Sequence, residues 1–124
     1  MGFYSERAVE PVRKPRPCLG CGKRIGAGEG ALECAGHYDG DFWSATYHTE
    51  CRRAEQLFND IHGAMEWIPI NEIEPVDWPW LIEESPAVAD RMAITTERFQ
   101  ALEARRQKRR FRAAIAKATE PEAA

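Results

Sequence analysis

Two pairs of metal-ligand side chains are the part of this sequence best suited to chemistry. Cys18 and Cys21 are separated by two residues, and His48 and Cys51 have the same spacing, with residues 22–47 between the pairs. Two thiols in a tight turn can bind one tetrahedral zinc ion, and a second pair at a helix start can complete its coordination. Because the protein would supply all four ligands, we expect one structural Zn2+ and no catalytic residues at this centre.

A third pair with ligand spacing provides an alternative. Cys34 and His37 are also separated by two residues, and one zinc ion binds only four of the six candidates. Cys34 falls in an apolar stretch and His37 in a segment flanked by glycines, so we favour a buried thiol and a loop residue. The sequence leaves open whether either side chain contributes to the metal site.

The cysteines are expected to be reduced. The segment from Met1 to Arg16 is rich in Arg and Pro and lacks the apolar run of a signal peptide. No stretch of the sequence reaches the roughly 20 apolar residues that a membrane-spanning helix needs. We therefore expect a cytoplasmic protein with no membrane partner, in which the thiols bind metal instead of forming disulfides.

The elements that must position the ligands are typical of a small α+β domain. Residues 1–17 contain three prolines and several basic side chains, which favours an extended basic arm. Residues 18–26 form the expected metal-binding turn. A β-hairpin should follow, with strands at 31–35 and 42–47 around a turn at 36–40.

A helix is predicted from His48 to about His62, where the spacing of apolar residues changes to a helical period. Both His48 and Cys51 would then lie in its first turn and point the same way. The apolar stripe of this helix is expected to consist of Ala54, Leu57, Phe58, Ile61 and Met65.

Proline interrupts residues 66–84, so an irregular or short-strand structure is expected there in place of a helix. Three tryptophans in this segment would wrap around the core. We assign 18–84 to one zinc domain that includes this segment. The tryptophans are Trp67, Trp78 and Trp80.

The remaining residues, 85–124, are expected to form a basic C-terminal helix. Ser85 and Pro86 are a favourable start, since a hydroxyl can cap the helix and proline is tolerated in its first turn. The helix should run to about Thr119. Two threonines at residues 95–96 offer a second capping site, so the sequence leaves open whether this helix is continuous.

A family resemblance can be stated on these residues. The stretch Cys-Leu-Gly-Cys-Gly-Lys-Arg-Ile-Gly-Ala-Gly-Glu-Gly-Ala-Leu (18–32), closed by Tyr-His-Thr-Glu-Cys (47–51), resembles a treble-clef zinc finger. It is similar to the poly(ADP-ribose) polymerase-type DNA-break finger and, less closely, to LIM modules. It also resembles small phage and prophage proteins with a basic arm and a Gly-Asp-Phe segment, here 40–42. The resemblance covers roughly residues 13–62 and implies a treble-clef fold, a zinc site and a bacterial or phage-infected host cell.

The net charge of −3 conceals three segments of opposite sign. Residues 1–24 hold six basic and two acidic side chains, residues 55–90 hold nine acidic and no basic ones, and residues 98–117 hold eight basic and one acidic. Such asymmetry is typical of proteins that bind partners. The alternative is that the acidic and basic segments neutralise each other within one molecule.

Basic side chains are concentrated at residues 105–112 and, in the arm, at 13–16. Phosphate backbones accept positive charge distributed around a helix, because each contact releases counterions. The alternative is a solvated helix. The nucleic-acid contacts that we predict are Arg13, Lys14, Arg16, Arg105, Arg106, Lys108, Arg109, Arg110 and Arg112.

The favoured function is therefore a non-enzymatic, zinc-stabilised binding module that contacts nucleic acid or a nucleoprotein complex. The alternative is a phage-encoded regulator or inhibitor of a host enzyme, with the tryptophans of the acidic segment 66–84 as a protein interface. A weak nuclease is a third hypothesis, but no paired carboxylates or activated nucleophile support it. Its candidate residues would be His37, His62, Asn59 and Asn71. The oligomeric state is left open.

Overall fold

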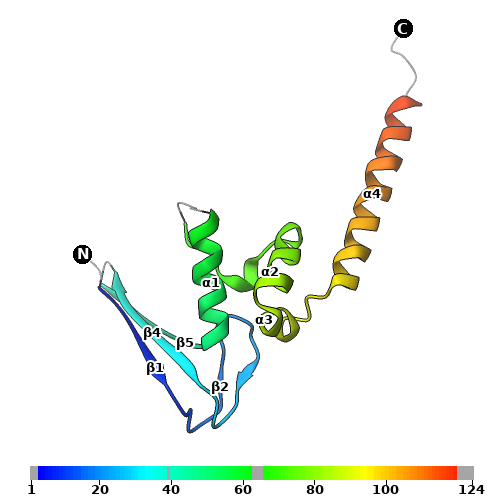
Figure 1. Ribbon diagram of the computed structural model, residues 1–124. Coiled ribbons are helices and arrows are strands. Elements are labelled where there is room, and N and C mark those ends of the chain that lie inside the picture. Colours follow the sequence, from blue (N-terminus) through cyan, green and yellow to red (C-terminus); the bar gives the residue numbers. More distant parts are fainter. Residues whose placement is uncertain (1–2, 39, 63–65, 120–124) are drawn as a thin grey trace.

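The computed structural model describes residues 3–38, 40–62 and 66–119. Within these residues, a three-stranded antiparallel sheet and a two-stranded hairpin lie at one end, and helices extend from them (Figure 1). This arrangement agrees with the predicted α+β class. The elements are β1 (Phe3–Val9), β2 (Arg16–Pro17), β3 (Arg24–Ile25), β4 (Ala31–Tyr38), β5 (Asp41–His48), α1 (Thr49–His62), η1 (Ile70–Glu72), η2 (Pro75–Asp77), α2 (Trp78–Glu84), α3 (Pro86–Arg91) and α4 (Thr96–Ala118).

The main sheet has the strand order β1–β4–β5. β4 and β5 form the predicted hairpin, with Ala31 opposite His48 at one end and Tyr38 opposite Asp41 at the other. Both strands are longer than the sequence indicated. The expected turn at 36–40 is correspondingly shorter, because residues 36–38 continue β4.

The indole ring of Trp43 explains why a glycine occupies position 36 of β4. Gly36 pairs with Trp43, and a Cβ atom at position 36 would come within 2.6 Å of the Trp43 indole. Glycine is thus required here so that the ring can lie across the strand. Gly40 is the residue that serves the turn, with a φ of 85° that other residues rarely adopt.

The N-terminal segment is extended, but it is not a separate arm. Residues 3–9 form β1, which pairs antiparallel with β4 from Phe3 opposite His37 to Val9 opposite Ala31. The sequence could not show this pairing, because the partner strand lies more than 20 residues away. Val12, just beyond β1, is buried in the core.

α1 begins at Thr49, so His48 is the last residue of β5 and not part of the helix as predicted. Of the expected apolar stripe, Ala54 and Phe58 are buried, whereas Leu57 and Ile61 are 40% and 58% exposed. The face that is buried instead includes a charged pair, Arg52 and Glu55. The buried residues of α1 are Cys51, Arg52, Ala54, Glu55 and Phe58; Met65 lies outside the described residues.

The irregular structure expected for residues 66–84 is wrong for residues 78–84. Residues 78–84 form the helix α2. Pro79 stands in the first turn of this helix, where the missing N–H would have no partner in any case. Two 3-10 turns precede α2, which agrees with the irregular structure expected before it.

The expected C-terminal helix is not continuous, a point that the sequence left open. α3 starts at Pro86 and ends at Arg91, and α4 begins at Thr96. The hydroxyl of Thr95 accepts a hydrogen bond from the backbone N–H of Arg98 at 3.1 Å, which caps α4.

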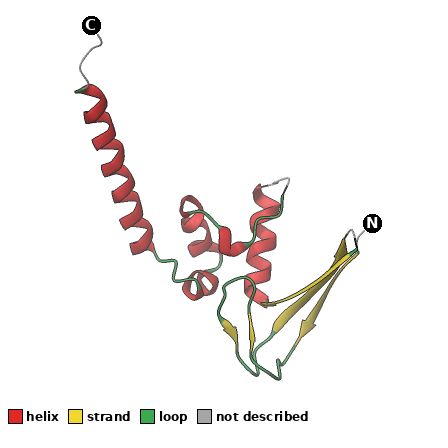
Figure 2. Cartoon of the chain, turned by 180° about the vertical axis from the view of Figure 1, so that it is seen from behind, coloured by secondary structure: helices red, strands yellow, loops and turns green. Residues whose placement is uncertain are grey.

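One core joins the sheet, α1 and the short helices. Ile25, Phe58, Ile70, Leu81 and Val88 are among its buried members. Only the start of α4 packs on this core, through Phe99 and Leu102, and the rest of the helix extends away from it (Figures 1 and 2). No helix in the described ranges is long and apolar enough to cross a membrane.

Candidate metal centre

The hairpin of β2 and β3 holds the first ligand pair in its turn. The backbone N–H of Cys18 donates to the carbonyl of Lys23, and the N–H of Gly22 donates to the carbonyl of Cys18, both at 2.9 Å. Gly22 has a φ of 76°, which closes this turn with little strain only in glycine. The thiols of Cys18 and Cys21 are therefore presented on a short, rigid loop.

The second ligand pair lies where β5 passes into α1. His48 ends the strand and Cys51 lies in the first turn of the helix. The ligand atoms of Cys18, Cys21, His48 and Cys51 all lie within 4.8 Å of one another. The Nδ1 atom of His48 is 3.4 Å from the sulfur of Cys21 and 3.8 Å from the sulfur of Cys51.

The two distances from the His48 nitrogen to the sulfurs match the size of a tetrahedral metal site. Metal–ligand bonds of about 2.0 to 2.3 Å place the ligand atoms of a tetrahedron roughly 3.3 to 3.8 Å apart. Cys18, His48 and Cys51 are buried and Cys21 is half-buried, so the protein encloses the group. The four side chains could hold one metal ion.

Backbone amides and a carboxylate surround the ligands. The N–H of His48 donates to the sulfur of Cys18 at 3.2 Å, and the N–H of Lys23 to the sulfur of Cys21 at 3.4 Å. The other ring nitrogen of His48, Nε2, lies 3.6 Å from a carboxylate oxygen of Glu29. This arrangement fixes the ring so that Nδ1 faces the sulfurs.

Of the three thiols, that of Cys18 is favoured to lose its proton. Hydrogen bonding from the Cys51 thiol, together with the N–H of His48, lowers the pKa of Cys18 to about 4, while burial opposes this. The pKa of Cys51 is raised, first because its proton bonds the Cys18 sulfur and second by burial. In the absence of metal one thiolate is thus stabilised by its neighbours; a bound cation would favour loss of the remaining protons.

Arg91 connects the helical part of the chain to the site. Its Nη1 atom lies 3.9 Å from the sulfur of Cys51 and 3.2 Å from a carboxylate oxygen of Glu50. Three thiolates around a divalent ion would leave one net negative charge, which this guanidinium partly offsets.

Cys34 and His37 lie outside the cluster. Cys34 is fully buried in β4, between Glu6 of β1 and Ala45 of β5. His37 lies in the same strand, opposite Phe42. Among the described residues, the group of side chains that could hold a metal ion contains neither of them.

The basic side chains expected to contact nucleic acid fall into two separate regions. All six in α4 are exposed, whereas Arg13 and Lys14 lie in the exposed segment between β1 and β2, away from α4 (Figures 1 and 2). Arg16 in β2 forms an ion pair with Glu33 at 3.4 Å. The structure does not bring the arm and the helix together.

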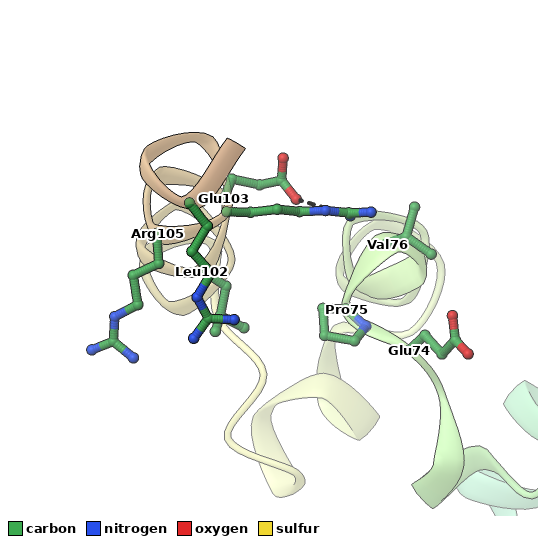
Figure 3. A pocket seen from close by; sticks show the side chains of 8 residues that line it. Glu74, Pro75, Val76, Leu102, Glu103 and Arg105 are labelled. Carbon is green, nitrogen blue, oxygen red and sulfur yellow. Dashed lines mark ion pairs between the residues drawn. The ribbon is translucent and has the colours of Figure 1, made fainter. Parts of the chain in front are cut away.

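Within the described residues, the acidic segment 55–90 forms no ion pair with the basic residues 105–112 of α4. Within the described chain, the acidic residues of this segment form ion pairs with Arg52 and His62, and residues 105–112 form one ion pair, between Arg106 and Glu103 of the same helix at 4.0 Å. A shallow hollow of about 420 Å³ separates α4 from η2. Figure 3 shows its lining side chains, which include Glu74, Val76, Leu102, Glu103, Arg105 and Arg106.

The three tryptophans predicted as a protein interface differ in exposure. Trp78 is 8% exposed and belongs to the core, with the guanidinium of Arg98 stacked on its ring at 4.9 Å. Trp80 is partly buried against Phe58, with ring centroids 5.5 Å apart. Only Trp67, 51% exposed, offers a large part of its ring to solvent. The interface as predicted is therefore wrong for Trp78, whose ring faces the interior.

A buried ion pair next to the site was missed from the sequence. Arg52 and Glu55 are 7% and 1% exposed, and their side chains meet at 2.8 Å. Their spacing of three residues on a helix indicates that the two side chains can pair. It does not indicate that the pair is buried, because such pairs are usually exposed.

The chain matches no family model, no curated protein and no solved structure, so its function is inferred from the geometry described above.

Proposed function

We propose that this protein is a non-enzymatic binding module of the treble-clef type, stabilised by one zinc ion, which contacts nucleic acid through α4. Two features support zinc. Three soft thiolates with one imidazole favour it over Mg2+ or Ca2+, which prefer oxygen ligands. Four protein ligands fill a tetrahedral site, which is typical of structural and not catalytic zinc.

The order of elements around the cluster supports the treble-clef assignment. The first ligand pair lies in the turn of a short hairpin (β2–β3), a second hairpin follows (β4–β5), and the last ligand lies in the first turn of α1. Zinc would hold the hairpin of β2 and β3 against the start of α1. For comparison, zinc binding provides on the order of 10 kcal/mol in small finger peptides.

The observation that carries the nucleic-acid proposal is the exposed basic surface of α4. At about 100° per residue, Arg105, Arg106, Arg109 and Arg110 occupy one sector of about 140° on the helix. All four are exposed, and among the described residues only Arg106 has an ionic partner. Guanidinium groups in such a row can contact successive phosphates, often by two hydrogen bonds each.

Gel-shift titration with double-stranded DNA, single-stranded DNA and RNA at several salt concentrations tests this proposal. The logarithm of the binding constant should fall linearly with the logarithm of salt, with a slope of about −0.9 per phosphate contact on duplex DNA. The variant Arg105→Gln/Arg109→Gln/Arg110→Gln should bind about tenfold more weakly or worse, with a slope shallower by about two to three.

A charge-matched control separates contact from net charge. The variant Arg7→Gln/Arg24→Gln/Arg53→Gln removes the same charge from exposed positions outside α4. It should keep most of the affinity. Equal losses in the two variants would show that α4 is not the contact surface, and no salt-dependent binding by the wild-type chain would overturn the nucleic-acid proposal itself.

A further inference from the structure

A groove lined by aromatic rings lies between the main sheet and α1, beside the loop of the first ligand pair, which contributes Leu19. Its volume is about 800 Å³, and its rings are those of Tyr4, Trp43, Tyr47 and Trp67. Three of them remain open to solvent: Tyr4 is 49%, Trp43 42% and Trp67 51% exposed. We call this feature the aromatic groove.

The buried guanidinium of Arg52 organises the aromatic groove. It lies 5.6 Å from the ring centroid of Tyr4, 5.2 Å from that of Tyr47 and 5.1 Å from that of Trp67. Its Nη2 atom donates to the Tyr4 hydroxyl at 2.6 Å. The rings are thus held in place before any partner binds, which lowers the entropy cost of binding.

The rim of the aromatic groove is acidic. Glu55 balances the charge of Arg52 at 2.8 Å, so the floor is neutral overall. At the edge, Asp60 lines the groove, and Glu6 accepts hydrogen bonds from the Tyr4 hydroxyl at 2.9 Å and from Gln56 at 3.1 Å. An apolar partner that carries positive charge fits such a surface.

The chain itself presents a surface of this chemistry. Phe111 and Ile115 of α4 are 67% and 47% exposed. They are four residues apart, so they share one face of the helix, and Lys108 and Arg112 flank them. This face is about 180° from Leu102, which packs on the core, and it is distinct from the sector that carries Arg106, Arg109 and Arg110.

The two surfaces cannot meet within one molecule. Only a few residues link α3 to α4, and α4 extends away from the sheet and from α1 in both views (Figures 1 and 2). We propose that the Phe111 and Ile115 face of α4 docks into the aromatic groove of a second copy of the chain, with Lys108 and Arg112 meeting Asp60 and Glu6 at the rim. The contact would cover Phe111 and Ile115 of one partner and the exposed rings of Tyr4, Trp43 and Trp67 of the other.

Sedimentation velocity on the zinc-loaded chain, over a concentration series, tests this proposal with two variants. The helix variant Phe111→Ser/Ile115→Ser and the groove variant Trp43→Ala/Asp60→Lys should each lose self-association by about tenfold or more. Because each retains one intact surface, an equimolar mixture of the two should form a one-to-one dimer. The single change Asp60→Lys, at an exposed helical position, should weaken association even if the Trp43 change perturbs the sheet.

The outcomes distinguish this arrangement from others. A wild-type chain that remains monomeric throughout would overturn the proposal. So would a groove variant that associates like the wild type, because pairing between α4 helices alone would then explain the oligomer. Nucleic-acid binding by the helix variant is measured separately, because this variant retains Arg105, Arg109 and Arg110. If the wild-type chain does not self-associate, nucleic-acid binding can still be observed. If nucleic-acid binding is not observed, self-association of the wild-type chain can still be observed.

Discussion

Glu29 lies 3.6 Å from Nε2 of His48, on the side of the imidazole opposite the sulfurs. Its other carboxylate oxygen accepts a hydrogen bond from the backbone N–H of Gly26 at 3.3 Å, which anchors it within the loop between β3 and β4. A proton on Nε2 would therefore face the Glu29 carboxylate, leaving Nδ1 free to bind the metal.

Replacing Glu29 with Gln should weaken metal binding without unfolding the metal-loaded protein. The loss of the charged partner leaves the imidazole less firmly oriented, and we expect a decrease in zinc affinity of about 10- to 100-fold. Competition with a chromophoric chelator measures this zinc affinity. Glu72→Gln, an exposed change away from the cluster, is the control, and equal affinities for the two variants would contradict this role for Glu29.

The Glu55 carboxylate should be important for stability. It accepts hydrogen bonds from the Tyr47 hydroxyl, Arg52, the Trp67 indole and the Ile70 amide at 2.8 to 3.3 Å. Glu55→Ala should lower the free energy of unfolding by about 3 to 5 kcal/mol, because it leaves the buried Arg52 charge unpaired. Urea unfolding in excess zinc measures this change.

The double variant Arg52→Met/Glu55→Leu serves as the comparison. It removes both charges and fills much of the same volume, so it should be more stable than Glu55→Ala. If the single and double variants unfolded at the same urea concentration, the uncompensated charge would not be the cause of the loss.

Gly20 is predicted to be intolerant of a side chain. A Cβ atom there would lie 3.0 Å from Cβ of Cys51 and 3.2 Å from side-chain atoms of Ile70 and Tyr47. Gly20→Ala should destabilise the protein by about 1 to 3 kcal/mol through overpacking and should lower zinc affinity by displacing Cys51. Gly30→Ala, whose Cβ would meet only the flexible end of Glu10 at 3.4 Å, should be nearly neutral in thermal unfolding.

Tyr4 should ionise late in an alkaline titration. Burial is the main cause that raises its pKa to about 12, and hydrogen bonding to Cys34 contributes. An unfolded tyrosine loses its proton near pH 10, so between pH 10 and about 12 the native state retains a proton that the unfolded state has lost. The contribution of Tyr4 to stability is therefore complete below pH 10 and is lost as the pH rises.

Tyrosinate absorbance, followed as the pH is raised, measures this ionisation. Tyr4→Phe should remove the phase near pH 12 and reduce the fall in stability at high pH. An ordinary phase near pH 10 that disappears in Tyr4→Phe would show that the environment of Tyr4 is not as described.

The parts of the site that the sequence predicted are those set by local spacing. Cys18 and Cys21 share one turn, and His48 and Cys51 lie three residues apart where β5 passes into α1. The geometry within each pair therefore depends little on the rest of the fold. The cap at Thr95 is local in the same way, because one hydroxyl and the following turn determine it, but the sequence left open whether the helix is interrupted there.

The parts that were missed depend on contacts distant in the sequence. The approach of Glu29 to His48 and of Arg91 to Cys51 follows from how loops and helices pack. The helix at 78–84 was missed because Pro79 indicates a break unless its position in the first turn is known. The burial of Arg52 and Glu55 contradicts the usual exposure of charged residues, and only the surrounding rings and amide make it favourable.

Native mass spectrometry of the freshly purified chain tests the central claim most directly. We expect one zinc ion per wild-type chain. Cys34→Ser, a change at a buried thiol outside the cluster, should retain that ion, and Cys18→Ser should lose it. A wild-type chain that carries no metal, or a Cys18→Ser chain that binds zinc as the wild type does, would contradict the account.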